Sequence, residues 1–120
     1  SAAGEVAVDF VKSGNRLTVI GFALAVAIGA PVMEEIAFRG LFFSALRKRG
    51  VGTRWTIAVT AVAFAVFHFE PIRLPILLAM GVVLGVLRWR TRGIGATIVA
   101  HAMVNSPGAI LIVLGMPSVA

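Results

Sequence analysis

The sequence contains no cysteine, which excludes a disulfide framework and a thiolate metal site. Charge is scarce as well: 13% of the residues are charged, whereas a soluble domain has about a quarter. Hydrophobic residues make up 59% of the 120 residues, and the mean hydropathy is +1.00. This apolar excess is too large to hide in a core of that size, so we expect the chain to be surrounded by lipid.

The sequence also lacks an internal repeat, a linker and the order of a signal peptide. Glu5 and Asp9 precede Lys12 and Arg16, whereas a signal peptide starts with a basic region and continues into a short apolar run. We therefore treat residues 1–120 as a single transmembrane core. We expect it to be a segment of a longer chain, because it begins at a serine and ends in apolar sequence.

Long apolar runs predict an all-α fold, a polytopic transmembrane bundle of about four to five membrane helices with an intramembrane active site. The expected elements are a surface helix at 1–16, apolar helices at 17–46, 55–69, 72–89 and 93–114, and the start of another helix within 109–120. Residues 17–46 would reach ~45 Å, more than the ~30 Å hydrocarbon core. They form either one tilted helix kinked near Gly29–Pro31 or two shorter pieces. Pro107–Gly108 should break the last run.

Basic residues flank the apolar runs, and the net charge is +6. Two loops on one side of the predicted bundle hold Arg47, Lys48, Arg49, Arg54, Arg88, Arg90 and Arg92. The positive-inside rule places that side in the cytoplasm. We interpret these charges as membrane-flanking, with the lipid bilayer as the partner and no nucleic acid. The composition, rich in Ala, Gly, Val and Arg, is compatible with a GC-rich bacterial gene, so we expect an integral protein of the bacterial inner (plasma) membrane.

Several polar residues lie inside the apolar runs, where a charge costs roughly 2.5–3.5 kcal/mol on insertion scales. Glu35 and Arg39 are four residues apart with the acid first, the favourable order for an ion pair within a helix. One arginine cannot neutralise two carboxylates, so Glu34 is left over, about 100° away around the helix. Such a residue requires solvation, another partner or a function.

His101 and Asn105 are also four residues apart and share one helix face. Interhelical hydrogen bonding alone would be worth only ~0.6 kcal/mol on average. Measured along the helices at ~1.5 Å per residue, Glu34 and His68 both lie about 20 Å from the basic side, His101 about 12 Å and Asn105 about 18 Å. Residues of three helices therefore reach similar levels in the membrane, which favours a shared site.

Three kinds of chemistry fit this set of side chains. In the first, Glu34 takes a proton from water, His68 holds that water or shares the proton, and His101 and Asn105 donate hydrogen bonds to an oxyanion. In the second, Glu34, His68 and His101 bind Zn²⁺, although the zincin spacing His-Glu-x-x-His is absent. In the third, the groups form a proton path in a transporter, which their clustering at one level disfavours.

Three motifs occur in order on successive apolar runs: Glu34-Glu35-x-x-x-Arg39, Phe64-x-x-x-His68 and His101-x-x-x-Asn105. Together they resemble the CPBP family of intramembrane proteases, the CAAX proteases and bacteriocin-processing (Abi) enzymes. The resemblance covers residues 28–106 and implies a glutamate-dependent endopeptidase.

Carried over from the family, Glu34 and His68 would activate water, His101 and Asn105 would form the oxyanion hole, and Glu35 and Arg39 would support them. The resemblance also implies a peptide or protein substrate, which could be membrane-associated. No cofactor is expected, with zinc as the alternative. A non-catalytic immunity or scaffold protein that keeps the family core is the competing function.

Two further patterns are interpreted as packing. Gly81-x-x-x-Gly85 has the spacing of a helix-packing motif. Phe64 and the aromatic residues at 67–69 are expected to pack against other side chains and not to bind substrate. A serine nucleophile fits poorly, because Ser106 is not in a Gly-x-Ser-x-Gly elbow.

Overall fold

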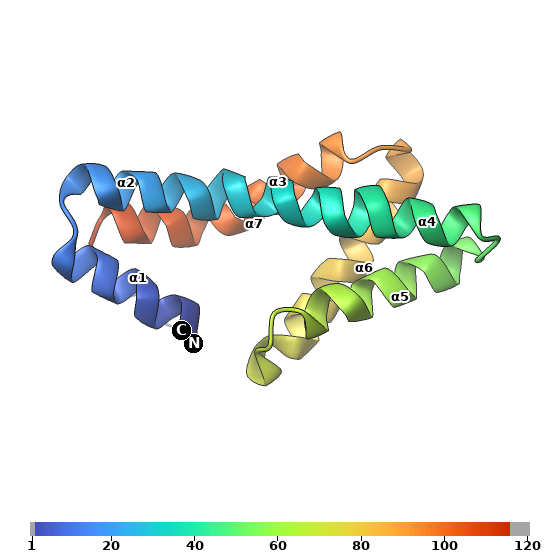
Figure 1. Ribbon diagram of the computed structural model, residues 1–120, viewed down its shortest axis with the longest axis horizontal. Helices are drawn as coiled ribbons and strands as arrows, with labels where there is room; N and C mark the ends of the chain where they lie inside the picture. The colour runs from blue at the N-terminus through green and yellow to red at the C-terminus, as the bar shows by residue number, and fades with distance from the viewer. Residues whose placement is uncertain (1, 116–120) are drawn as a thin grey trace. The chain divides into compact units, whose positions relative to one another are not determined.

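The computed structural model describes residues 2–115, and within that range every regular element is helical (Figure 1). The elements are α1 (Ala2–Ser13), α2 (Arg16–Leu24), η1 (Ala25–Gly29), α3 (Ala30–Glu35), η2 (Ile36–Phe42), α4 (Phe43–Lys48), α5 (Thr53–Val66), η3 (Pro71–Arg73), α6 (Leu74–Thr91) and α7 (Gly95–Val113). The predicted all-α class is confirmed. The further helix predicted within 109–120 is not seen up to Val113, which still belongs to α7, and residues 116–120 lie outside the described range.

Elements α2 to α4 form one continuous helix, Arg16–Lys48, so the first predicted run is one helix and not two. In the described part of the chain, three helices are long and apolar enough to cross a membrane, namely Arg16–Lys48, Pro71–Thr91 and Gly95–Val113. Helix α5 is apolar but shorter. The chain is therefore an integral, polytopic helical membrane protein.

Two stretches of the first long helix, η1 and η2, are π-helical, with hydrogen bonds from each N–H to the carbonyl five residues earlier. Where such a stretch returns to the ordinary four-residue pattern, one carbonyl is passed over. The last five-residue hydrogen bond of η1 joins the Ala30 N–H to the Ala25 carbonyl, and the last one of η2 joins the Phe43 N–H to the Phe38 carbonyl. In η2 the carbonyl left without a backbone donor is the next in sequence, that of Arg39. In η1 it is that of Val26, because the next residue along the helix is Pro31, which has no N–H. Each of these carbonyls needs a donor from elsewhere.

The predicted break at Pro107–Gly108 is wrong, because α7 continues through Pro107. Proline removes a single backbone N–H from the helix, and a transmembrane helix tolerates this where other groups compensate. The carbonyl that loses its N–H partner is that of Met103, four residues before Pro107. Helix α7 therefore continues through the proline with one backbone bond fewer.

The chain divides into two compact units, each described here by itself. Unit 1 comprises the residues up to Val32 together with those from His101 onward. Its core is formed by small and aliphatic side chains of α2 and α7: Val19, Ala23, Ala109 and Ile112. Unit 1 thus pairs the first part of the long helix with most of α7.

Unit 2 comprises residues 33–100. Helices α5 and α6 run antiparallel in it and approach closely (Figure 1). A Cβ on Gly81 would lie 2.8 Å from the Ala61 Cα, and one on Gly85 would lie 3.0 Å from a methyl carbon of Ile57. The predicted packing role of the Gly81-x-x-x-Gly85 motif is confirmed, and it brings the two backbones into contact around the buried Phe64.

Candidate active site

The predicted ion pair of Glu35 and Arg39 lies in the centre of unit 2. Arg39 Nη1 is 3.0 Å from Glu35 Oε1, and both side chains are fully buried. The second guanidinium nitrogen donates to the Gly81 carbonyl at 3.1 Å, and the guanidinium lies 4.5 Å from the centre of the Phe64 ring. Removing either partner would leave a buried charge uncompensated. Glu35 is therefore engaged by Arg39, as the spacing predicted.

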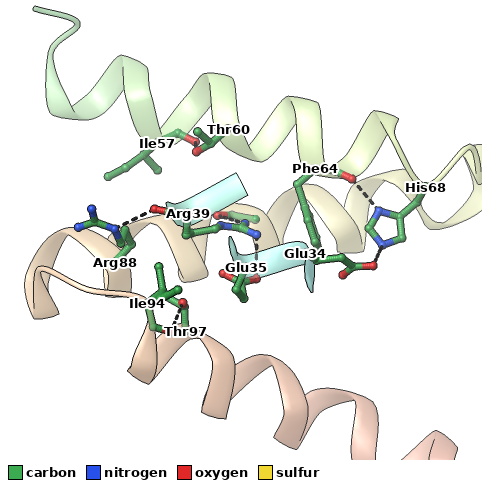
Figure 2. Close-up of polar contacts among 11 residues, drawn as sticks. Glu34, Glu35, Arg39, Ile57, Thr60, Phe64, His68, Arg88, Ile94 and Thr97 are labelled. Carbon is green, nitrogen blue, oxygen red and sulfur yellow. Dashed lines mark hydrogen bonds and ion pairs between the residues drawn. The ribbon is translucent and has the colours of Figure 1, made fainter. Parts of the chain in front are cut away.

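His68 lies in the turn that follows α5, and its ring is oriented by a backbone group (Figure 2). Its Nδ1 is 2.6 Å from the Phe64 carbonyl oxygen. Because a carbonyl oxygen can only accept, we assign the hydrogen to Nδ1. In the neutral ring this leaves the lone pair on Nε2, the nitrogen that faces Glu34. The next residue, Phe69, has a left-handed backbone with φ 51°, which is uncommon for a bulky residue.

Glu34 and His68 come together from the long helix and from the turn after α5. Glu34 Oε1 is 3.7 Å from His68 Nε2, and the side chains are 29% and 22% exposed. This distance is longer than a direct hydrogen bond, but one water molecule can bind both groups at such a separation. Unlike Glu35, then, Glu34 is partly accessible and faces an imidazole.

His101 and Asn105 lie on α7 in unit 1. His101 is buried at 2% exposure. The Asn105 side-chain amide donates to the Val26 carbonyl at 3.0 Å, the carbonyl left without a backbone donor in η1. The structure thus brings Glu34, Glu35, Arg39 and His68 together in unit 2. The oxyanion role of the two α7 residues stays a prediction.

The donors present in unit 2 do not by themselves make a zinc site. Structural and catalytic zinc sites use at least three protein ligands, and Glu34 with His68 supplies two. Among the described residues, no three histidine, aspartate or glutamate side chains are grouped so that they could hold a metal ion. The zinc alternative requires His101 as a third ligand, and it too stays a prediction.

Sequence reasoning missed one residue next to this site. Arg88 was interpreted as a membrane-flanking charge, but its Nε donates to the Arg39 carbonyl at 2.9 Å. Its Nη2 donates to the Ser44 hydroxyl at 3.2 Å, and its guanidinium lies 4.8 Å from the centre of the Phe43 ring. The signal was present in the spacing: Arg88 follows Gly81 by seven residues, so it lies on the face of α6 that carries the packing motif.

The fold and this site define a class: a polytopic helical membrane protein in which a partly accessible carboxylate of an apolar helix faces an oriented imidazole in the turn after α5. Comparison with known proteins identifies the family. Residues 16–107 match the family described as type II CAAX prenyl endopeptidase Rce1-like, and the chain belongs to it. The matched range contains every predicted site residue from Glu34 to Asn105.

A relative in Bacillus subtilis (strain 168) agrees with this family. The candidate membrane peptidase YdiL is 34% identical over 82 residues, which cover 67% of this chain and 32% of that protein. The chain thus spans about a third of the length of this relative. No solved structure matches the chain significantly.

Proposed function

We propose that the protein is an intramembrane endopeptidase in which Glu34 and His68 activate a water molecule. The observation that carries this proposal is the 3.7 Å approach of Glu34 Oε1 to His68 Nε2, combined with the hydrogen bond that orients the His68 ring. A carboxylate and an imidazole at this separation can both bind the water that one of them deprotonates. Family membership supports hydrolysis of a peptide bond over proton transport.

In the proposed reaction, Glu34 takes a proton from the water as its oxygen attacks the scissile carbonyl carbon. The carbonyl oxygen becomes an oxyanion, to which His101 and Asn105 donate hydrogen bonds; such a donor is worth roughly 2.7–4 kcal/mol of barrier. When the C–N bond breaks, the proton held by Glu34 passes to the leaving amine. Glu35 has no role in proton transfer in this proposal, because its side chain is buried and paired with Arg39 at 3.0 Å.

The substrate proposed is a peptide or protein cleaved near its C-terminus, in CAAX fashion, or a small peptide that loses its leader. The family description names CAAX prenyl endopeptidase, and a substrate with a lipid anchor would reach a site within the apolar helices by diffusion in the bilayer. The location proposed is the bacterial inner membrane, supported by the bacterial relative.

The test is cleavage of two fluorogenic peptides, one farnesylated CAAX peptide and one unprenylated apolar leader peptide, by the full-length protein in detergent micelles. Glu34→Gln should lower kcat by at least about 10²-fold, because it removes the general base while keeping the size of the side chain. Glu70→Gln is the matched control: it changes another carboxylate of unit 2, one paired with Arg73 at 2.8 Å. It should stay within about threefold of the unmodified protein, as surface ion pairs are weak.

Retention of cleavage by Glu34→Gln would overturn the mechanism. The scaffold or immunity function replaces the proposal if the unmodified protein cleaves neither peptide and the Glu34→Gln protein still protects cells or binds its partner as well as the unmodified protein does. Loss of cleavage on treatment with a zinc chelator, restored by added zinc, would favour the metalloprotease alternative.

A further inference from the structure

The carbonyl of Arg39 is the backbone group that η2 leaves without an N–H partner in its own helix. A buried carbonyl without a donor is costly in an apolar surrounding. In unit 2 the donor comes from another helix, because Arg88 of α6 places its Nε 2.9 Å from this oxygen (Figure 2). A bond from a charged group is stronger than one between neutral groups. The carbonyl that the π-helical turn η2 leaves without a backbone donor is therefore satisfied by a side chain that is 49 residues away in the sequence.

Helix α6 contacts Arg39 both at its guanidinium and at its backbone carbonyl. The Gly81 carbonyl accepts from the guanidinium at 3.1 Å, and Arg88 donates to the backbone carbonyl at 2.9 Å. Arg39 in turn pairs with Glu35 at 3.0 Å, and Glu34 directly precedes Glu35 in the same helix. Contacts thus lead from the end of α6 to Glu35, and the backbone joins Glu35 to Glu34, the carboxylate that faces His68.

We propose that Arg88 is a positioning residue for the candidate active site: by donating to the Arg39 carbonyl it stabilises the π-helical turn η2 and holds Glu34 opposite His68. The part that concerns catalysis rests on the proposed peptidase function. The contact with the Arg39 carbonyl stands independently of it.

The first experiment needs no substrate. Hydrogen exchange of the amides of residues 36–48 is measured by mass spectrometry on the full-length protein in detergent micelles. Arg88→Met keeps an unbranched apolar stem and removes every donor, so opening of η2 should become more frequent and exchange about tenfold faster. Arg90→Met is the matched control, since Arg90 is an exposed arginine near the same helix end. Its exchange should equal that of the unmodified protein.

The second experiment uses whichever of the two fluorogenic peptides the unmodified protein cleaves. Arg88→Met should lower kcat by about tenfold and leave KM within about twofold, because a displaced Glu34 impairs the chemical step and not the binding of the peptide. Arg88→Lys retains a cationic donor and should restore most of both kcat and exchange protection. Arg90→Met should leave both kinetic constants unchanged.

The outcomes separate the two proposals. Equal exchange of residues 36–48 in Arg88→Met and Arg90→Met would overturn the role of Arg88 in stabilising η2, whether or not the protein cleaves the peptide. Faster exchange with unchanged kcat would overturn the positioning role alone. If the unmodified protein cleaves no peptide, the peptidase function fails while the exchange data still decide on η2. Should Arg88→Met fail to fold, Arg88→Gln with Arg90→Gln as its control replaces it: a neutral amide is a weaker donor than a guanidinium, so exchange of residues 36–48 should still be faster in Arg88→Gln, and equal exchange in the two variants would overturn the role of Arg88.

Discussion

The helix Arg16–Lys48 contains two π-helical turns, η1 and η2, which differ in the side chain that donates a hydrogen bond to each. Each leaves one carbonyl without a backbone donor: that of Arg39 in η2, where the hydrogen-bond pattern returns to four residues, and that of Val26 in η1, where the next residue is Pro31 and has no N–H. Both carbonyls accept a hydrogen bond from a side chain of a later helix: Asn105 for η1, at 3.0 Å, and Arg88 for η2, at 2.9 Å. The orphaned carbonyl thus accepts from a neutral amide in unit 1 and from a cation in unit 2.

The surroundings differ as much as the donors. Around η2, the fully buried pair of Arg39 and Glu35, the Gly81 carbonyl and the Phe64 ring form one connected network. Around η1, the buried groups are small and aliphatic, such as Ala23 and Ala109. Because charged hydrogen bonds are roughly twice as strong as neutral ones, η2 should be the rigid turn and η1 the adaptable one. That is the arrangement expected if the proposed general base, Glu34, must be held in place.

The largest expected effect is the loss of the buried ion pair. Arg39→Met leaves the Glu35 carboxylate buried without its cation, which should lower the free energy of unfolding by about 3–5 kcal/mol. The measurement is denaturant unfolding of the full-length protein in mixed micelles, followed by circular dichroism. The matched control is Glu35→Leu combined with Arg39→Met, which removes both charges and should recover much of the loss. A single variant within 1 kcal/mol of the unmodified protein would contradict the network around η2.

The sequence predicted this network only in part, because spacing within one helix can be read from the sequence whereas a contact between two distant helices cannot. The pairing of Glu35 with Arg39 and the packing of Gly81 depend on spacing within one helix, so both could be read locally and both are confirmed. The partnership of Arg88 with the Arg39 carbonyl depends on a π-helical turn, and one extra residue in an apolar run leaves no mark in composition or periodicity.

The error at Pro107 has the opposite cause. Proline is a strong local signal for a break, but α7 continues through Pro107, because a long apolar helix can lose one backbone bond without ending. The meeting of Glu34 with His68 was expected from depth along the helices. His101 and Asn105 belong to unit 1, and their oxyanion role stays a prediction.

The next effect in size is expected at η1. Asn105→Leu removes the donor to the Val26 carbonyl while keeping a side chain of similar length, and should lower the free energy of unfolding by about 1 kcal/mol. The same unfolding measurement in micelles applies. Ser106→Ala is the neighbouring control, because its hydroxyl bonds within α7 to the Ala102 carbonyl. A loss as large as that of Arg39→Met would show that the two turns are equally dependent on their donors, and the comparison would fail.

The smallest effect is expected from Ser44→Ala, and it sharpens the interpretation of Arg88. The variant removes the 3.2 Å contact between Arg88 Nη2 and the Ser44 hydroxyl, and leaves the 2.9 Å bond from Nε to the Arg39 carbonyl in place. The change in unfolding free energy should stay within about 0.5 kcal/mol, and exchange at η2 should not change. If Ser44→Ala instead matches Arg88→Met in both measurements, Arg88 acts through the hydroxyl. The π-helical turn would then be stable without a donor to its carbonyl, and the contrast between η1 and η2 would have to come from the ion pair alone.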